Sequence, residues 1–572
     1  MEKKWVLKEP VGLEFKKKYP EIPGVILQLL ANRGLTEQTE INQFLSPEYD
    51  QDLLDPFLFP DMEKAVQRIY LAVENNEKIA IHGDYDADGI TASVLVANVL
   101  KQMKADFEVY IPHRDKEGYG LNQKTVKYFA KKKVKLIITV DCAISNTEEV
   151  ELAKKNGIDV IITDHHDQPL ELPQPLAVID PKVDQCNYPF KFLAGVGVAF
   201  KLAQAIVKKD QQNIFPEGFE KWLLDLVAIG TVADMMPLLA ENRILVKYGL
   251  IVLNKSKRLG LKLLAENAGL LPVSEKDLIN SENLGYNLGP RINAAGRMDH
   301  ANAASFLLLS EDLDEAKKLA GQIEINNQDR QKLTDKIIDK VRQEIKDPEG
   351  KYLILAHGKN WPLGIIGLAS GRLKDEYNLP VVIISKTKGR IVGSGRSIPE
   401  FNLIEALQKL DKYFETYGGH PGAAGFSLKN KKDLPEIEKQ LLEIAAKELT
   451  GKDLRPKLDI EAELDLNELN WELFDQIEKF EPFGAANPKP VFLVKNLKVE
   501  TIKTVGQDNK HLKLFLKQDN MVKSFGAIGF GFGHKIEEIK YGNTLDVVCE
   551  INLNEFNGNR SLELKINDLK KV

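Results

Sequence analysis

The chain reads HGDYDADG at residues 82–89, which places one histidine and three aspartates within seven positions: His82, Asp84, Asp86 and Asp88. The apolar run KIAI precedes this turn and a helix-like stretch follows it. Three carboxylates at alternate positions of a tight, partly buried turn repel one another strongly, and a bound divalent cation offsets that repulsion. The sequence therefore predicts a metal site where a short strand gives way to a helix.

A calcium-binding EF-hand loop also begins D-x-D-x-D-G, but it needs a bidentate glutamate at its twelfth position. Counted from Asp84, that position is Leu95. The KIAI run is β-type, whereas an EF-hand loop follows a helix. Both features argue against calcium, and the remaining plain alternative is a solvated acidic turn.

Length and composition predict a large cytoplasmic protein. The 572 residues, 43% of them hydrophobic, suffice for three or four domains. The three cysteines are widely spaced without a CxxC pair, which favours neither a disulfide framework nor a cysteine zinc site. The N-terminus lacks the apolar core of a signal peptide, and no apolar run reaches the roughly 18 residues of a membrane span. A net charge of −6 argues weakly against coating nucleic acid through bulk positive charge.

From about residue 61 to 180, short β-rich runs alternate with amphipathic helical patterns; the runs are KIAIHG, FEVYIP, KLIITVD, DVIITDHH and LAVIDP. This alternation predicts an α/β domain with a mainly parallel sheet, whose ligands lie beyond the carboxyl ends of the strands. The candidate residues follow the runs there: Asp141 follows LIITV, and Asp164, His165 and His166 follow VIIT. Asp234 closes IGTVAD after an apolar helical stretch, where a helix cap or solvated turn is the alternative.

Together these segments supply enough ligands for two cations: His82, Asp86, Asp88, Asp141, His165 and Asp234. Mixed imidazole and carboxylate ligation without thiolate suits Mn²⁺ and tolerates Mg²⁺ or Co²⁺. Two such metals activate water and stabilise both oxygens of an in-line phosphoryl displacement. The residues therefore predict hydrolysis of a phosphoester or phosphoanhydride.

Seven motifs carry a family resemblance. HGDYDADG, VDCAIS, TDHH and GTVAD resemble, in order and spacing, the four motifs of the DHH phosphoesterase superfamily. PRINAAGRM at 290–298, SGRS at 394–397 and GGHPGAAG at 418–425 resemble the bacterial RecJ family of single-strand-specific exonucleases. The resemblance covers nearly the whole chain. It implies a multidomain α/β protein, in which a DHH domain and a DHHA1 domain are joined by a long helix and a C-terminal OB-type β-barrel follows.

We expect five parts: an N-terminal segment at 1–55, the DHH catalytic metal-binding domain at 56–270, a connecting helical region at 271–350, the DHHA1 substrate-binding domain at 351–455 and the OB-fold single-strand-binding domain at 456–572. The long helical pattern at about 311–346 is equally compatible with a solvated helix packed on one domain. Five phenylalanines of the last part could stack on bases, although most of them are expected in the core: Phe492, Phe515, Phe525, Phe530 and Phe532.

The resemblance also implies roles for the metal-site residues. His82, Asp86 and Asp141 would hold one metal, and the second would be held by Asp88, Asp141, His165 and Asp234. Asp84 is either a ligand or a supporting residue. His166 would face the scissile phosphate, while Asp164 would orient the imidazoles, and these two are the predicted catalytic residues. One departure concerns backbone geometry, because the family commonly has glycine where this chain has Ala143.

Arginines near small residues are candidates for phosphate binding, because a guanidinium fork binds phosphate oxygens in pairs. By resemblance, the pocket for a terminal 5′ phosphate comprises Arg114, Ser394 and Arg396. Contacts to the strand near the metals are expected from Arg291, Asn293 and Arg297. His420 and its surrounding glycines could form a phosphate cradle or only cap a helix. The chain has no nucleotide-binding P-loop motif.

The resemblance implies a single-stranded-DNA-specific 5′ to 3′ exonuclease that needs two Mn²⁺ or Mg²⁺ ions, releases 5′ mononucleotides and acts in DNA repair and recombination. The expected partners are single-stranded DNA and, by analogy, single-stranded-DNA-binding protein and a helicase, with no membrane. Two alternatives stay open. One is another DHH phosphoesterase acting on nanoRNA, cyclic dinucleotides or pyrophosphate, and the other is a catalytically silent DNA-binding or replication-scaffold relative.

Overall fold

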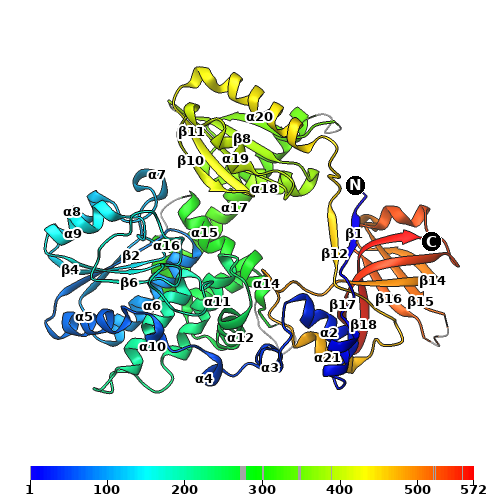
Figure 1. The fold of residues 1–572 in the computed structure, drawn as a ribbon, viewed down its shortest axis with the longest axis horizontal. Coiled ribbons are helices and arrows are strands. Elements are labelled where there is room, and N and C mark those ends of the chain that lie inside the picture. The colour runs from blue at the N-terminus through cyan, green and yellow to red at the C-terminus, as the bar shows by residue number, and fades with distance from the viewer. Residues whose placement is uncertain are drawn as a thin grey trace. The chain divides into compact units, whose positions relative to one another are not determined.

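Figure 1 shows the computed structural model, which describes residues 2–270, 278–298, 302–345, 350–387, 389–519, 521, 523–556 and 558–572. The chain divides into two compact units. The larger unit contains residues 3–290, 308–311 and 457–572, and the smaller unit contains residues 291–307 and 312–456 together with the first two residues. The domain borders expected from the sequence stay predictions, and the border at 270/271 adjoins residues 271–277, which lie outside the described part.

A five-stranded parallel sheet forms the centre of the catalytic region in the larger unit. Its spatial order is β3 (Phe107–Tyr110), β2 (Lys78–Gly83), β4 (Val134–Val140), β5 (Asp159–Thr163) and β6 (Ala177–Ile179). The five β-rich runs predicted from the sequence are these five strands, so the α/β prediction is confirmed. The chain reverses its direction of winding between β2 and β4, and ligands of open α/β sheets bind at such a switch point.

The helix that follows β2, α6 (Ala87–Gln102), is buried over almost its whole length because α10 and α11 pack against it. The other helices of this region are α5 (Met62–Glu74), α7 (Arg114–Glu117), α8 (Gln123–Lys131), α9 (Thr147–Lys155), α10 (Gly195–Lys208), η2 (Glu220–Leu223), α11 (Leu224–Ala233), α12 (Ala240–Lys255), α13 (Leu259–Asn267), α14 (Ser281–Asn283) and the π-helical η3 (Leu284–Leu288). Most residues of the next two helices, α15 (Gly289–Met298) and α16 (Asn302–Leu309), belong to the smaller unit. The apolar residues on all sides of α6 explain its central place.

A closed β-barrel forms the C-terminal part of the larger unit and confirms the predicted barrel. Its strands are β14 (Phe492–Val505), β15 (His511–Lys517), β16 (Phe525–Gly529), β17 (Thr544–Phe556) and β18 (Asn559–Lys571), with the short β13 (Ala462–Glu463) at the side of β14. The antiparallel pairing of β14 with β17 closes the barrel. Closure leaves β14 without the open edge that an unpaired strand would present.

The N-terminal segment packs onto the barrel region rather than standing alone. Its elements are β1 (Lys4–Leu7), α1 (Leu13–Lys18), α2 (Gly24–Asn32), α3 (Gln38–Leu45), α4 (Tyr49–Asp52) and η1 (Pro56–Leu58). Strand β1 pairs in parallel with β12 (Lys457–Ile460), and the two lie side by side in Figure 1. Leu30 and Phe44 share a hydrophobic core with Phe474 and Phe480 around α21 (Trp471–Glu478).

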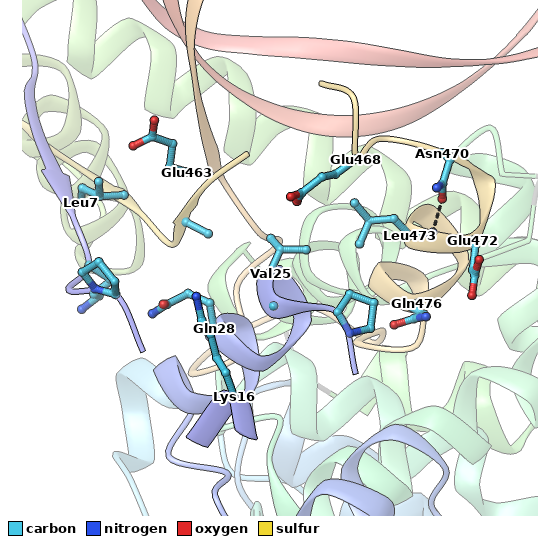
Figure 2. Close-up of a pocket in the computed structure, with 15 residues that line it drawn as sticks. Leu7, Lys16, Val25, Gln28, Glu463, Glu468, Asn470, Glu472, Leu473 and Gln476 are labelled. Atoms are coloured by element: carbon cyan, nitrogen blue, oxygen red, sulfur yellow. Dashed lines mark hydrogen bonds between the residues drawn. The ribbon is translucent and has the colours of Figure 1, made fainter. Parts of the chain in front are cut away.

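A groove of about 600 Å³ lies between α2 and α21. Figure 2 shows side chains that line it, among them the apolar Val25 and Leu473 and the carboxylates of Glu468 and Glu472. The Asn470 side chain caps α21 by accepting a hydrogen bond from the Leu473 N–H. The residues predicted to act in catalysis or binding line other parts of the molecule.

The smaller unit is built on a mixed sheet in the order β10 (Phe414–His420), β11 (Ala423–Leu428), β9 (Arg390–Arg396), β8 (Val381–Thr387) and β7 (Ile354–Lys359). Its helices are α17 (Leu313–Ile345), α18 (Leu363–Tyr377), α19 (Leu403–Gln408) and α20 (Leu434–Leu449). The predicted long helix is α17, and its C-terminal half packs Ile337 and Val341 against Ile365 and Ala369 of α18. This half of the helix is therefore anchored within its own unit.

Two further observations bear on the class of protein. None of the helices in the described residues combines the length and the apolar character that crossing a bilayer requires. The three cysteines, Cys142, Cys186 and Cys549, are buried free thiols.

Candidate metal centre

The acidic turn connects β2 directly to α6, as a strand-turn-helix and not as the helix-loop-helix of an EF-hand. Asp86 is the N-cap of α6, and its Oδ1 accepts hydrogen bonds from the N–H groups of Asp88 (3.0 Å) and Gly89 (3.1 Å). A Cβ atom at Gly89 would lie 2.7 Å from the backbone N of Asp84. Only glycine therefore allows the turn to fold this closely. Because a strand and not a helix precedes the turn, the calcium alternative does not fit.

Asp141 and His165 follow the neighbouring strands β4 and β5 and meet at the same edge of the sheet. The His165 Nε2 atom lies 3.1 Å from Asp141 Oδ1, 3.8 Å from Asp88 Oδ2 and 3.6 Å from Asp234 Oδ2. Asp234 caps the C-terminus of α11, which packs against α6. The three carboxylates that resemblance assigned to one metal thus surround the imidazole assigned to the same metal.

The N-terminus of α10 holds Asp88 in place. The Gly195 N–H donates to Asp88 Oδ2 (2.7 Å), and the Val196 N–H donates to Asp88 Oδ1 (2.8 Å). A Cβ atom at Gly195 would lie 2.5 Å from the Asp141 Cβ, so the helix approaches both carboxylates only because this residue is glycine. The positive end of the helix dipole adds to this stabilisation of the Asp88 carboxylate.

A second set of oxygens lies on the other side of Asp141. Ligand atoms of Asp84, Asp86 and Asp141 lie within 4.8 Å of one another, a spacing suited to a shared cation. The Oδ1 atom of Asp84 and both ring nitrogens of His82 are buried, and they have no hydrogen-bond partner within the described part of the chain. Buried polar atoms without a partner are costly, and coordination of a metal would satisfy them. The residues present therefore fit a cation-binding site.

Electrostatics supports the same conclusion. Burial, followed by the charge of Asp86, raises the pKa of Asp84 to about 8. Burial, followed by neighbouring carboxylates, raises the pKa of Asp88 and of Asp141 well above the usual value. Burial lowers the pKa of His82 to about 4, which keeps its imidazole neutral. Neutral imidazoles and carboxylates crowded in this way are what a divalent cation binds and stabilises.

His166 and Asp164 form a separate pair beside the cluster. The fully buried Asp164 accepts from the backbone N–H of Ile144 and lies 2.7 Å, Oδ1 to Nδ1, from the ring of His166. Burial opposes the charged imidazole, but the hydrogen bond and charge of Asp164 outweigh it and raise the pKa of His166 to about 9. The side chain of His166 is 46% exposed, so a proton on it is accessible to a ligand.

Six of the predicted metal residues are thus gathered in one place: Asp84, Asp86, Asp88, Asp141, His165 and Asp234. His82 lies near the end of β2, just before the acidic turn, and the individual roles of all seven residues stay predictions. A carboxylate oxygen of Asp84 lies within 4.8 Å of ligand atoms of Asp86 and Asp141, which favours a direct role over a supporting one. Ala143, where the family commonly has glycine, adopts a φ of 86°. This left-handed conformation favours glycine, so the departure that the sequence indicated coincides with backbone strain.

Sequence reasoning missed two side chains near the centre. The Tyr119 hydroxyl lies 3.1 Å from His166 Nδ1 and donates to the Asp141 carbonyl. Asp180 follows β6, and burial raises its pKa to about 8. The run LAVIDP could have indicated Asp180, because it has the same strand-then-aspartate order as LIITVD. Tyr119 carried no comparable signal.

The candidate phosphate-binding residues are divided between the units. In the larger unit, the Arg114 guanidinium lies 5.0 Å from the centre of the Tyr85 ring, beside the acidic turn. In the smaller unit, Arg396 and Ser394 lie on β9 and both face Gly367 of α18. Arg396 donates to the Gly395 carbonyl and has no acidic partner within the ranges that the structure describes, so its charge is available to an anion.

The other predicted contacts of the smaller unit are already engaged. The Arg291 Nε donates to Glu324 Oε2 at 2.7 Å, and Arg297 donates to the Gly364 carbonyl at the start of α18. Asn293 lies between them on α15. GGHPGAAG forms the hairpin of β10 and β11 and does not cap a helix, with the exposed His420 at the end of β10 accepting from the Gly422 N–H.

The five phenylalanines of the barrel region divide into core and surface residues, a division that the sequence did not specify. Phe492 is fully buried, and Phe525 and Phe532 pack against the barrel core. Phe515 and Phe530 are exposed. Phe515 belongs to a hollow of about 500 Å³ that also contains Trp471, Lys513 and Arg560.

Three family models match the chain: the DHH family N-terminal domain at residues 78–231, the DHHA1 domain at 349–447 and the RecJ OB domain at 460–568. The single-stranded-DNA-specific exonuclease RecJ of Bacillus subtilis is 38% identical over 553 residues, which cover 96% of this chain and 68% of that protein. The RecJ of Haemophilus influenzae is 32% identical, covering 91% of this chain and 92% of that protein.

Solved structures agree with these matches. The crystal structure of Thermus thermophilus RecJ in complex with Mn²⁺ superposes with a TM-score of 0.82 at 26% identity, covering 99% of this chain and 79% of that chain. A structure of the same protein in complex with Mg²⁺ gives a TM-score of 0.76 at 26% identity, covering 99% of this chain and 78% of that one.

Proposed function

The chain belongs to the RecJ family of single-stranded-DNA-specific exonucleases, and we propose that it hydrolyses single-stranded DNA from the 5′ end and releases 5′ mononucleotides in DNA repair and recombination. The observation that carries this proposal is the convergence of Asp88, Asp141, His165 and Asp234 on one point at the carboxyl edge of the parallel sheet. The buried Asp84 oxygen beside this point supports a second cation.

Divalent ions at this centre, Mn²⁺ or Mg²⁺, would supply polarisation of the scissile phosphate and an activated water. We propose that His82, Asp84, Asp86 and Asp141 hold one ion, while Asp88, Asp141, His165 and Asp234 hold the other. Backbone donors from α10 fix the Asp88 oxygens before any ligand arrives. Fixing Asp88 in this way reduces the reorganisation of that carboxylate that substrate binding would require.

We propose that His166 acts as the general acid. Its raised pKa keeps a proton on the ring at neutral pH, and Asp164 and Tyr119 orient that ring. As water attacks the phosphorus, the bond to the 3′ oxygen of the terminal nucleotide breaks, and His166 donates its proton to that oxygen. The products are a 5′ mononucleotide and a strand with a new 5′ phosphate.

We propose that Arg396 and Ser394 bind the terminal 5′ phosphate together with Arg114. Arg396 supports this role because its half-buried guanidinium lacks an acidic partner within the described ranges, and a phosphate would supply one. Arg291, Asn293, Arg297 and His420 are proposed contacts of the strand backbone. Of these, Arg291 would have to share its charge with Glu324.

Cytoplasmic location and protein partners are further proposals. Three buried free thiols support a reducing compartment. Single-stranded-DNA-binding protein and a helicase are proposed as partners on family analogy. Co-purification of either protein with the tagged full chain, at physiological salt and after nuclease treatment, tests this proposal. Absence of both from the complex counts against it.

The two alternatives have less support. A pyrophosphatase would not need the barrel, which matches the RecJ OB domain over residues 460–568. A catalytically silent relative would not need all the metal residues, which this chain retains at the distances described above.

The test uses single-stranded DNA with a labelled 5′ phosphate in the presence of Mn²⁺. The wild type should release labelled mononucleotide, and Asp141→Ala should lose about 10³-fold or more of this activity, because both ions lose a ligand. Asp50→Ala, which changes an exposed carboxylate of α4, is the matched control and should keep full activity. Release of dinucleotides alone, or full activity of Asp141→Ala, contradicts the proposal.

A further inference from the structure

Three large apolar side chains are exposed on segments of the larger unit that contribute residues to the metal centre or pack against α11, which ends at Asp234. Phe192 is 52% exposed, Met235 77% and Tyr286 79%. Single exposed apolar residues are common on protein surfaces, but several around one site indicate a binding surface. We define Phe192, Met235 and Tyr286 as the apolar rim.

Two members of the apolar rim, Met235 and Phe192, lie on segments that contribute to the metal centre. Met235 follows Asp234 directly in the chain. Phe192 precedes Leu193, whose backbone lies beside the His165 imidazole, and Gly195, which donates to Asp88. The Asn242 side chain donates to the carbonyls of Phe192 and Pro237, so it ties the segments of Phe192 and Met235 together.

Tyr286 reaches the same place through the π-helix η3. This element packs against the end of α11: a Cβ atom at Gly285 would lie 3.7 Å from Val232, and one at Gly289 would lie 3.2 Å from the Ala233 Cβ. Leu284 and Leu288 of η3 are fully buried. Because these residues fix the inner face of η3, Tyr286 is left on the outer face, near the end of α11 that carries Asp234.

The backbone at two of these positions has an identifiable form. Met235 has a φ of 56° at the end of α11, where the N–H groups of Met235 and Met236 donate to the Val232 and Thr231 carbonyls and close the helix. This closure holds Met235 directly after Asp234 with most of its side chain exposed. The π-helical turn of η3 is uncommon and occurs often at functional sites.

We propose that the apolar rim packs against the nucleobases next to the scissile phosphate, so that the centre recognises a nucleic acid strand by base faces as well as by phosphates. This proposal rests on the proposed function. Aromatic rings stack on bases without sequence preference, and methionine adapts to flat π surfaces. Paired bases in a duplex hide these faces, so the apolar rim would favour unpaired strands.

The test compares 5′-phosphorylated strands that carry normal bases with strands in which the terminal nucleotides are abasic. Tyr286→Ala should lower kcat/KM about tenfold on normal strands, as expected from the loss of one stacked base. On abasic strands the same substitution should change kcat/KM less than twofold. Tyr286→Phe keeps the ring and should restore the wild-type rate on normal strands.

Two further variants complete the comparison. Met235→Asn removes the apolar side chain but suits the left-handed backbone, and it should also lower the rate on normal strands only. Tyr541→Ala removes an equally exposed ring of the barrel, 78% exposed, and should match the wild type. As a spectroscopic readout, 2-aminopurine at the terminal position should be quenched by the wild type and Tyr286→Phe but not by Tyr286→Ala.

The outcomes separate the two proposals. If the wild type does not degrade single-stranded DNA, the proposed function fails. If the wild type degrades it but Tyr286→Ala and Met235→Asn match the wild type, or lose equal activity on normal and abasic strands, the apolar rim does not bind bases and this inference is overturned.

Discussion

The two units differ in how their proposed functional residues are held. In the larger unit, Asp88 is buried and accepts hydrogen bonds from two backbone N–H groups. In the smaller unit, Arg291 forms an ion pair with Glu324, and His420 is exposed. Backbone hydrogen bonds of the fold hold the Asp88 carboxylate of the metal centre. Among the proposed strand contacts, Arg291 is paired with a carboxylate and Arg297 with a backbone carbonyl. The metal centre is therefore preorganised for catalysis. Binding of the strand, in contrast, would require a contact such as Arg291 to exchange its protein partner for a phosphate of the strand.

The largest effect is expected from substitution of Asp88, the carboxylate that accepts two backbone hydrogen bonds from α10. Asp88→Asn should lower kcat by more than about 10³-fold, because losing one ligand forfeits several kcal/mol of transition-state stabilisation. Mononucleotide release from labelled single-stranded DNA measures the effect.

The matched control is Asp225→Asn, which changes another buried aspartate of the same unit that pairs with Arg258 outside the metal centre. Its folded fraction should keep activity within about threefold, since surroundings away from the site add little to the rate. Equal losses in the two variants would mean that burial, and not ligation, explains the result.

Metal binding should also stabilise the larger unit specifically. At a free Mn²⁺ concentration 100 times its dissociation constant, the stabilisation is about 2.7 kcal/mol. Thermal unfolding with Mn²⁺ or with chelator should show this as a higher transition temperature for the wild type. Asp141→Ala should show a much smaller shift, and an identical shift in both proteins would place the bound Mn²⁺ elsewhere.

The proposed phosphate contacts predict a graded result within the smaller unit. Arg396→Gln should reduce the preference for a 5′-phosphorylated over a 5′-hydroxyl strand by about 10- to 100-fold, because a hydrogen bond to a charged group contributes about 1.5–3 kcal/mol. Arg291→Gln should change that preference less than about threefold, since Glu324 already neutralises Arg291.

Arg372→Gln is the control for these two variants, because Arg372 is an exposed arginine that pairs with Asp335 on the surface. Competition between the two strands in one reaction measures the preference directly. If Arg291→Gln removes the preference and Arg396→Gln retains it, the assignment of the 5′-phosphate pocket is wrong.

The metal centre was largely predictable from the sequence because its residues follow parallel strands. Asp141 and His165 are far from His82 in the chain, yet strand ends of one parallel sheet meet at one edge. The five strands and the barrel were also predictable, because short apolar or alternating runs bounded by turn residues mark their strands in the sequence.

Partners were not predictable, because a motif names a residue type and not its neighbour. Nothing in AGVGVAF indicates that the Gly195 N–H would bind Asp88, and nothing in PRINAAGRM indicates that Arg291 would bind Glu324. The phase of the barrel strands was equally hidden, so Phe492 in the core and Phe515 at the surface looked alike. These relations arise from tertiary packing, which one sequence does not specify locally.

The smallest predicted effect concerns the one position where the sequence departs from the family beside the metal centre. Ala143 has a φ of 86° and is buried among the residues that follow β4, so its Cβ carries strain that glycine would remove. Ala143→Gly should raise the free energy of unfolding by up to about 1 kcal/mol, because relief of 1–2 kcal/mol of left-handed strain outweighs the greater freedom of glycine in the unfolded chain. Ala153→Gly, at a buried right-handed position of α9, should lower it instead. Denaturant unfolding measures the change in the free energy of unfolding of both variants. Destabilisation by Ala143→Gly would contradict the prediction, because it would mean that contacts of the Ala143 methyl group outweigh the backbone strain.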